Sequence, residues 1–351
     1  MSPYPPTIAQ AKASPAFPAA LWDLQPSQSG ILAAGASRRS PANVSWEIHG
    51  DGPIKVILIC GLGLVKADLQ NQTLFLGHTH GDKYSLLLVD NRGTGGSAAG
   101  THFHRTSTSA MAHDILEVAD HIGWTGHRQL HVGGGSMGGM IAQELALAAP
   151  TRICSLSLWS TTARYERSPR ASWLQGIWES LQMVLPKPLE EEIRHFARIA
   201  YTPEWLAAPD DVELPEADTP RCSVPPGGIG RFENNYERFV AVEVQKRQVA
   251  GSLTFSGFVM HAVAAATHHK SPEQLRKLAD EVGRERIMVL HGVQDQAMPV
   301  ELGKKLIEAI RPGTSSIVDG LGHAPIHERP RWFNDLLAER FEAGEKDKLR
   351  S

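Results

Sequence analysis

A single serine surrounded by five glycines is the clearest chemical feature of this sequence. The stretch LHVGGGSMGGMIAQELALAAP, Leu130–Pro150, places Ser136 between an apolar run and a helical pattern. Residues Gly134–Gly138 fit the pattern G-x-S-x-G, in which a sharp strand-to-helix turn exposes a serine hydroxyl. A serine presented in this way can attack a carbonyl carbon.

The glycines next to Ser136 have a steric explanation. A sharp turn brings neighbouring backbones close together, so Gly134 and Gly138 are predicted to be elbow glycines that leave room for that approach. The backbone N–H of Met137, at the start of the helix, is predicted to donate to an oxyanion. A glycine-rich loop that merely contains a serine is the alternative interpretation.

Two nucleotide-binding motifs with similar glycines fit less well. A Rossmann fingerprint predicts an acidic residue about 20 residues further on, at the end of the next strand, where this chain has Trp159 and Ser160. A Walker phosphate loop requires Lys-Ser/Thr after its glycines, and this sequence has none there.

A serine hydroxyl is a poor nucleophile, so it needs a histidine base that a carboxylate orients. After a G-x-S-x-G turn, the acid precedes the histidine along the chain. Asp295 follows the apolar run IMVLH, and His323 follows the next predicted strand. Both loops should leave the same edge of a parallel sheet as Ser136, so we expect Ser136, Asp295 and His323 to act together.

Other acids and histidines are weaker candidates. Asp319 comes just before the histidine loop and ranks well below Asp295 as the acid. His291 and His327 are predicted to be structural, because most of the 16 histidines must be surface or hydrogen-bonded residues.

The loop Cys60-Gly61-Leu62-Gly63 follows an early apolar run and supplies a second predicted oxyanion donor, the backbone N–H of Leu62. Cys60 itself is not predicted to be a nucleophile. It ends a buried strand, and no helix amino terminus lies there to lower the pKa of its thiol.

Strand and helix patterns alternate along much of the chain, which is typical of a mainly parallel, doubly wound α/β sheet. Predicted strands are Val44–His49, Ile54–Cys60, Tyr84–Val89, Leu130–Val132, Ile153–Trp159, Ile287–His291 and Ser315–Val318. Predicted helices are Thr108–His121, Met140–Ala148, Trp173–Leu185, Leu189–Ala200, Tyr236–Val249, Pro272–Val282, Glu301–Ile310 and Arg331–Phe341.

The alternation predicts a core interrupted by a helical insert. The expected divisions are a poorly ordered Pro/Ala/Ser-rich extension (1–40), an α/β core (41–160 and 271–342), a helical cap insert (161–270) and a solvated tail (343–351). Aromatic residues of the insert, among them Phe196 and Trp205, suit either an apolar substrate pocket or packing onto the core.

Composition argues against several classes of partner. The net charge of −3, with Lys and Arg scattered, does not favour nucleic acid, and the longest apolar run is too short to span a membrane. Three distant cysteines and an amino terminus unlike a secretory signal predict a cytoplasmic protein. We expect no cofactor and no metal; His102 and His104 are only a weak metal-binding pair. The oligomeric state is not predicted.

The sequence resembles the α/β-hydrolase fold superfamily, over about residues 42–342. GGSMGGMIAQELA resembles the nucleophile elbow of the esterase and lactonase branch, and DNRGTGGS, residues 90–97, resembles a loop common in the superfamily. HGVQDQAMP and GLGHAPIHERP resemble its acid and histidine loops. The early loop departs from the family pattern, because it begins Cys60-Gly61 instead of His-Gly, and this leaves its local hydrogen bonding open.

The resemblance implies a serine hydrolase that cleaves a carboxylic ester or lactone of a small, apolar substrate through an acyl-enzyme. Cleavage of a carbon–carbon bond by the same groups remains open. An acyltransferase of the homoserine acetyltransferase type, whose elbow is also similar, is one alternative. A ligand-binding protein that kept the fold without catalysis is another.

Overall fold

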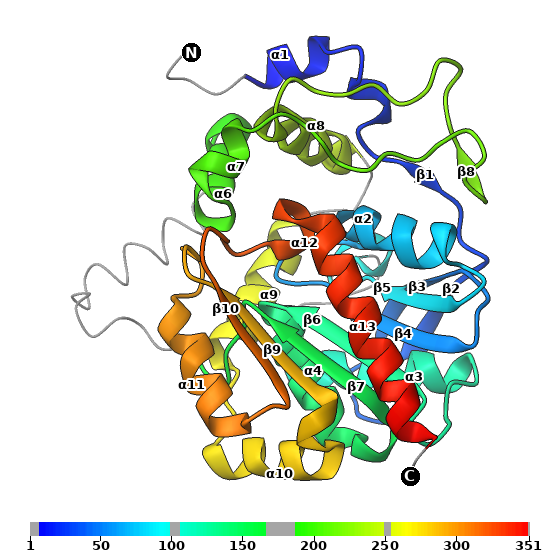
Figure 1. The fold of residues 1–351 in the computed structure, drawn as a ribbon, viewed down its shortest axis with the longest axis vertical. Helices are drawn as coiled ribbons and strands as arrows, with labels where there is room; N and C mark the ends of the chain where they lie inside the picture. Colours follow the sequence, from blue (N-terminus) through cyan, green and yellow to red (C-terminus); the bar gives the residue numbers. More distant parts are fainter. Residues whose placement is uncertain (1–6, 99–105, 166–186, 249–253, 350–351) are drawn as a thin grey trace.

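The computed structural model describes residues 7–98, 106–165, 187–248 and 254–349, built around one large β-sheet (Figure 1). Its strands are β2 (Gln28–Ala34), β3 (Ala42–His49), β4 (Ile54–Ile59), β5 (Tyr84–Val89), β6 (Leu130–Gly135), β7 (Ile153–Trp159), β9 (Ile287–Gly292) and β10 (Thr314–Val318). They lie in the order β10-β9-β7-β6-β4-β5-β3-β2. All neighbours from β10 to β5 are parallel, whereas β3 and β2 are antiparallel. The predicted fold class is confirmed.

Helices cover both faces of the sheet. Alternation along β4 sends Ile57 and Ile59 into one apolar cluster and Val56 and Leu58 into another, as expected for a strand buried on both faces. The first cluster contains side chains of α3 (Thr108–His121), α4 (Met137–Ala148), α10 (Pro272–Val282) and α11 (Val300–Ile310). The second contains side chains of α12 (Pro325–Glu328) and α13 (Pro330–Lys348). Each described helix is too short or too polar to cross a bilayer.

Between β7 and α10, the chain forms a separate group of helices. These are α6 (Leu189–Ala200), α7 (Pro203–Ala207), α8 (Asn235–Gln248) and α9 (Phe255–Thr267). Helices α6, α7 and α8 lie above the sheet in Figure 1, and α12 lies between them and the strands. Phe196 stacks on Phe239, and Trp205 stacks on Tyr201, so these aromatic residues pack within the group. The predicted helix Trp173–Leu185 lies outside the described residues.

Short segments connect these elements. They are η2 (Lys66–Leu69), α2 (Gln70–Gln72), η3 (Thr73–Thr79), η4 (Gly95–Ser97), η5 (Pro150–Arg152), β8 (Cys222–Ser223) and η6 (Arg284–Arg286).

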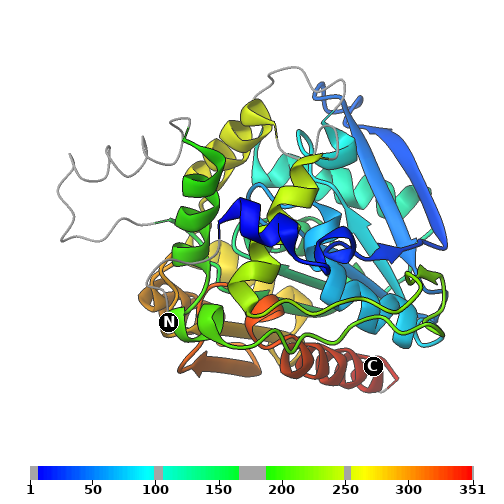
Figure 2. The ribbon, with the colours of Figure 1, turned by 90° about the horizontal axis from the view of Figure 1, so that it is seen from above.

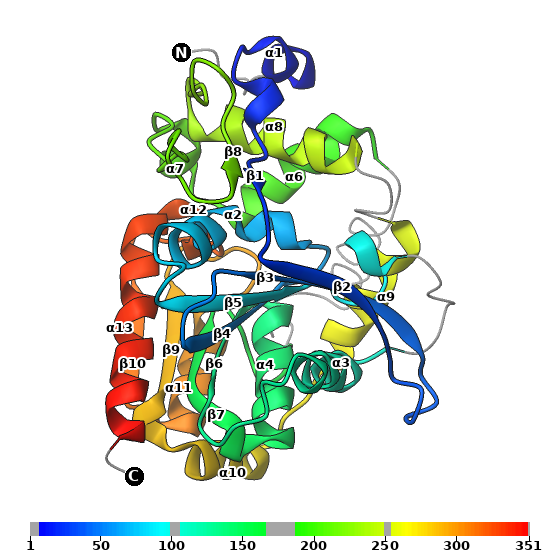
Figure 3. The ribbon, with the colours of Figure 1, turned by 90° about the vertical axis from the view of Figure 1, so that its right-hand side faces the viewer.

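The amino-terminal residues differ from the poorly ordered extension that we expected for 1–40. Residues 7–34 contain α1 (Ile8–Ala13), η1 (Phe17–Ala19), β1 (Asp23–Leu24) and the edge strand β2. Helix α1 lies across α8, and the chain then descends to the sheet edge (Figures 2 and 3). Tertiary contacts explain the order: Ala11 is buried in the cluster of α6 and α8, and β2 pairs with β3 over seven residue pairs.

The carboxyl-terminal helix is longer than predicted. We expected it to end at Phe341, with a solvated tail from residue 343, but α13 continues to Lys348. Gly344 is buried against the carbonyl of Cys154, and Glu345 bonds His131, so the last turns are held by the sheet.

A buried ion pair fixes the loop that follows β5. Arg92 Nε and Nη2 donate to the two carboxylate oxygens of Asp114 on α3, at 2.7 and 2.6 Å, and Arg38 binds the same carboxylate. The Arg92 and Asp114 side chains are only 2% and 3% exposed. Removal of one partner would therefore leave a buried charge without its counter-ion.

We predict that Asp114→Ala lowers the free energy of unfolding by about 3–5 kcal/mol, because Arg92 would remain buried and uncompensated. Urea denaturation measures this change. Lys277→Ala is the control, since its pair with Glu281 is exposed and should contribute less than about 1 kcal/mol. Equal losses in the two variants would contradict the prediction.

Candidate active site

Ser136 stands between β6 and α4 in an uncommon backbone conformation, with φ 54° and ψ −127°. A non-glycine residue with positive φ is held there only when its surroundings fix it. The Ser136 N–H donates to the Trp159 carbonyl at 3.2 Å, and its own carbonyl accepts from Thr161 Oγ1 at 2.7 Å. The N–H groups of Gly139 and Met140 bond the same carbonyl. The turn is thus held from β7 and from α4.

The glycines around Ser136 lie where backbones meet. A Cβ at Gly138 would lie 2.2 Å from the Ile59 carbonyl oxygen, and one at Gly134 would lie 2.4 Å from the Gly138 carbonyl carbon. A Cβ at Gly139 would lie 2.7 Å from the Thr161 side chain. These short distances explain why glycine occupies these positions: a side chain there would overlap the neighbouring atoms.

Asp295 and His323 meet across two loops. Asp295 follows β9, His323 follows β10, and His323 Nδ1 lies 2.8 Å from Asp295 Oδ2. The other carboxylate oxygen accepts the backbone N–H groups of Ala297 and Met298 at 2.9 and 2.7 Å. Asp295 is buried and the His323 side chain is 15% exposed, so the carboxylate orients an imidazole that solvent can reach.

The surroundings of Asp295 favour its charged form. Burial alone would raise its pKa, but His323, His291 and the Met298 N–H outweigh burial and lower the pKa to about 2. His291 Nε2 lies 2.8 Å from the Met298 carbonyl and 3.2 Å from Asp295 Oδ2. This imidazole therefore stabilises the loop that contains Asp295.

The rival residues have other partners. Asp319 accepts from Gln294 Nε2 at 2.8 Å in an exposed position. His327 lies between Tyr201 Oη and the Asp68 carbonyl, each at 2.8 Å, and burial lowers its pKa. Burial raises the pKa of the Cys60 thiol well above its usual range, as a structural cysteine requires.

The predicted oxyanion donors lie on segments next to Ser136. A Cβ at Gly61 would lie 3.6 Å from Ser136 Cβ, so the loop that contains Leu62 runs directly beside the serine. Met137 begins α4, where the helix dipole favours negative charge. Among the described residues, no acceptor is recorded for the N–H of either Leu62 or Met137.

The structure brings Asp295 and His323 into contact but records no hydrogen bond between the Ser136 hydroxyl and His323 within the described part of the chain. Both side chains are half-buried at carboxyl ends of strands. The catalytic assignment of the three residues therefore stays a prediction.

The contacts of α6 and of the residue before α7 with the histidine loop were not predicted from the sequence. The His323 N–H donates to the carbonyl of Ala200, the last residue of α6, at 2.9 Å. Glu328 accepts from the Gly322 N–H and from Thr202 Oγ1, and burial raises the pKa of its carboxyl group. The contact of Ala200 with His323 and that of Thr202 with Glu328 each join residues more than a hundred positions apart, and no local sequence signal joins them.

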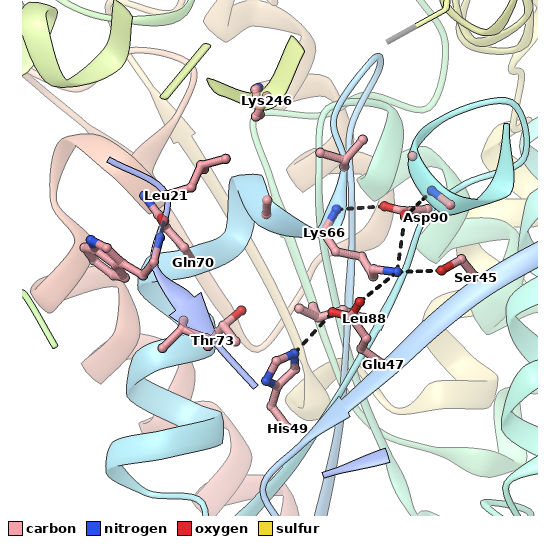
Figure 4. Close-up of a pocket in the computed structure, with 16 residues that line it drawn as sticks. Leu21, Ser45, Glu47, His49, Lys66, Gln70, Thr73, Leu88, Asp90 and Lys246 are labelled. Atoms are coloured by element: carbon pink, nitrogen blue, oxygen red, sulfur yellow. Dashed lines mark hydrogen bonds and ion pairs between the residues drawn. The ribbon is translucent and has the colours of Figure 1, made fainter. Parts of the chain in front are cut away.

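A cavity of about 400 Å³ lies beside the loop after β5 and is separate from the Ser136 site (Figure 4). Lys66 projects toward it between two acids, with Nζ 3.1 Å from Glu47 and 3.2 Å from Asp90, and it donates to Ser45 Oγ at 2.7 Å. Its charge is therefore balanced within the protein. The predicted site residues do not line this cavity.

One group of possible metal ligands occurs among the described residues. Ligand atoms of His131, Cys154 and Glu345 lie within 4.8 Å of one another, at the amino ends of β6 and β7 and so at the sheet edge opposite Ser136. His131 and Lys348 both bond Glu345, and burial raises the pKa of Cys154 to about 12. Hydrogen bonding accounts for this cluster. His102 and His104 lie outside the described residues.

Together, the fold and site define an α/β protein that presents serine, acid and histidine loops at the carboxyl edge of a parallel sheet. The model of the α/β hydrolase family matches residues 56–336, most of the chain. The chain belongs to this family.

Several known proteins are similar to the chain. A protein of Azorhizobium caulinodans named "Putative carbamate hydrolase RutD" is 29% identical over 207 residues, which are 59% of this chain and 72% of the relative. A thermophilic esterase from Thermogutta terrifontis has a TM-score of 0.65 and 21% identity, over 91% of this chain and 99% of its own. A bromoperoxidase from Bacillus anthracis has a TM-score of 0.62 and 18% identity, over 90% and 100%. The two structural similarities show the fold.

We predict that Gly138→Ala lowers the free energy of unfolding by about 1–3 kcal/mol or more, because the new methyl group would overlap the Ile59 carbonyl. Chemical denaturation checks the change. Gly126→Ala is the matched control, since its methyl group would meet only the flexible Gln129 side chain. An equally small effect at both positions would contradict the close approach.

We also predict that Asp295 contributes to the pH dependence of stability. Its pKa is lowered from 3.8 to about 2, so its contribution is present above pH 4 and is lost as the pH falls toward 2. Between pH 5 and pH 2, the wild-type protein should lose roughly 2 kcal/mol more than Asp295→Asn. Urea unfolding at several pH values measures the difference, and parallel curves would argue against it.

Proposed function

We propose that this protein is a serine hydrolase that cleaves a carboxylic ester or lactone of a small molecule. The observation that carries the proposal is the 2.8 Å contact of His323 with the buried Asp295, on loops that share the sheet edge with the turn of Ser136. An aspartate-oriented imidazole at that edge is what a serine nucleophile requires. Membership of the α/β hydrolase family supports the same reaction class.

In the proposed reaction, Ser136 Oγ attacks the substrate carbonyl carbon while His323 Nε2 takes its proton. Asp295 keeps the proton of the imidazole on Nδ1 and stabilises the imidazolium that forms. The N–H groups of Leu62 and Met137 donate to the oxyanion. Collapse of the tetrahedral intermediate breaks the bond to the alcohol oxygen, which takes the proton from His323 and leaves an acyl-enzyme.

Release of the acyl group follows the same steps with water. His323 removes a proton from a water molecule, whose oxygen attacks the acyl carbon, and the bond to Ser136 Oγ breaks as Oγ regains a proton. Helices α6 to α9 are proposed to form a cap over this site, because α6 contacts the histidine loop directly.

A carbamate is a second candidate substrate. The similarity to the protein named as a carbamate hydrolase favours it, at 29% identity over 207 residues. Attack by Ser136 on a carbamate carbonyl needs the same base and oxyanion donors, so a substrate screen must include carbamates beside esters and lactones. An alcohol acceptor in that screen tests the acyltransferase alternative.

We predict that a fluorophosphonate labels Ser136. The Ser136 Oγ would form a bond to phosphorus as the P–F bond breaks and fluoride leaves, with His323 taking the hydroxyl proton and the phosphonyl oxygen occupying the oxyanion position. Mass spectrometry of the labelled peptide checks the site. Ser136→Ala should abolish labelling, and His323→Ala should slow substrate turnover by about 10⁴-fold or more. Cys60→Ala is the control and should leave labelling unchanged.

Absence of labelling in the folded protein, with a small sulfonyl fluoride as well as with the larger probe, would contradict the proposal. Ligand binding that Ser136→Ala does not affect, without turnover, would instead support a binding protein.

A further inference from the structure

A fully buried histidine on α9 touches two loops next to the proposed site. His261 Nδ1 lies 3.2 Å from the backbone nitrogen of Gly63, and its Nε2 lies 3.0 Å from the carbonyl oxygen of Arg92. Gly63 directly follows Leu62, the proposed oxyanion donor. Asn91 Nδ2 also donates to the Cys60 carbonyl at 3.0 Å, so the two loops are joined directly as well as through His261.

The partners of His261 determine its protonation. A backbone N–H faces Nδ1, so Nδ1 must carry the lone pair, and a carbonyl oxygen faces Nε2, so Nε2 must carry the hydrogen. Burial lowers the pKa of His261 to about 4, which is consistent with this neutral form. A second proton would place two N–H groups against each other at Gly63.

Other contacts hold α9 against the loop that follows β5. Thr254 Oγ1 donates to the Gly93 carbonyl at 3.1 Å, and a Cβ at Gly257 would lie 2.0 Å from that carbonyl oxygen. Four residues further along, His261 is on the same buried face of α9, and Ala264 continues that face into the core. The packing of α9 therefore fixes the position of the His261 imidazole.

We infer that His261 is a positioning residue for the oxyanion loop: its Nδ1 holds the Gly63 N–H, and this contact orients the neighbouring N–H of Leu62 toward Ser136. The inference rests on the proposed function. It also answers the question that Cys60-Gly61 leaves open, because an imidazole from α9 supplies a hydrogen bond to this loop. His261 does not touch the reacting atoms.

Three substitutions at this position separate positioning from simple filling of the core. His261→Asn keeps an acceptor near the place of Nδ1, whereas His261→Gln keeps a donor near the place of Nε2. His261→Phe fills the volume and keeps neither. If His261 acts through Gly63, only the His261→Asn variant should keep the hydrogen bond from the Gly63 N–H and so the position of the loop.

The first measurement is amide hydrogen exchange of the full-length protein, followed by mass spectrometry of peptides that contain Gly63. We expect faster exchange in His261→Gln and His261→Phe, and near wild-type exchange in His261→Asn. His268→Asn is the control, because His268 is also buried beside α9 but bonds Thr108. Wild-type exchange in all three His261 variants, each folded by circular dichroism, would overturn the inference.

The second measurement is the rate of fluorophosphonate labelling at Ser136, with kcat and KM once a substrate is known. Loss of the hydrogen bond between Gly63 and residue 261 should lower the labelling rate and kcat by about 10- to 100-fold while KM changes little. The reason is that a small displacement of the Leu62 N–H weakens stabilisation of the transition state more than binding of the substrate. Faster exchange with an unchanged labelling rate would overturn positioning. No labelling of wild-type protein at all would instead overturn the proposed function, whatever the exchange result.

Discussion

The close approach of α4 to β4 is the constraint on which this molecule depends. Gly138 lies against the Ile59 carbonyl, where a single methyl group would have to fit within 2.2 Å. That approach lets the chain turn from β6 into α4 within one residue, and it forces Ser136 to a φ of 54°. The same contact places the start of α4 beside the loop after β4, so the two proposed oxyanion donors lie on adjacent segments.

The helices between β7 and α10 do more than cover the sheet edge. Ala200 of α6 accepts the N–H of His323, and His261 of α9 accepts the N–H of Gly63, so this group contacts both the histidine loop and the proposed oxyanion loop. Lys246 of α8 is buried against Asp68, whose carboxylate also accepts the Val65 N–H. A substitution within these helices can therefore alter the position of the proposed catalytic groups even where the substituted residue does not contact the substrate.

Local sequence patterns predicted the central strands of the sheet well and located the loops of the proposed site, because those signals depend on near neighbours. Strands buried on both faces appear as apolar runs, and the glycines of the elbow appear as an unusual local cluster. The patterns failed at β2, an edge strand with mostly exposed or half-buried residues. They also did not indicate α9, whose residues are apolar on most sides and so lack the helical period.

By itself, the sequence determined the fold class, the family resemblance and the residues of the proposed site, since each depends on residue types at fixed short spacing. The sequence ranked Asp295 above Asp319, and the tertiary structure places Asp295 in contact with His323 while Asp319 binds Gln294 in an exposed position. Only the tertiary structure decided that Ala200 and His261 contact the loops of the proposed site. Those contacts join residues from 123 to 198 positions apart, and their physical cause is the packing of helices onto the sheet edge, which short-range patterns do not encode.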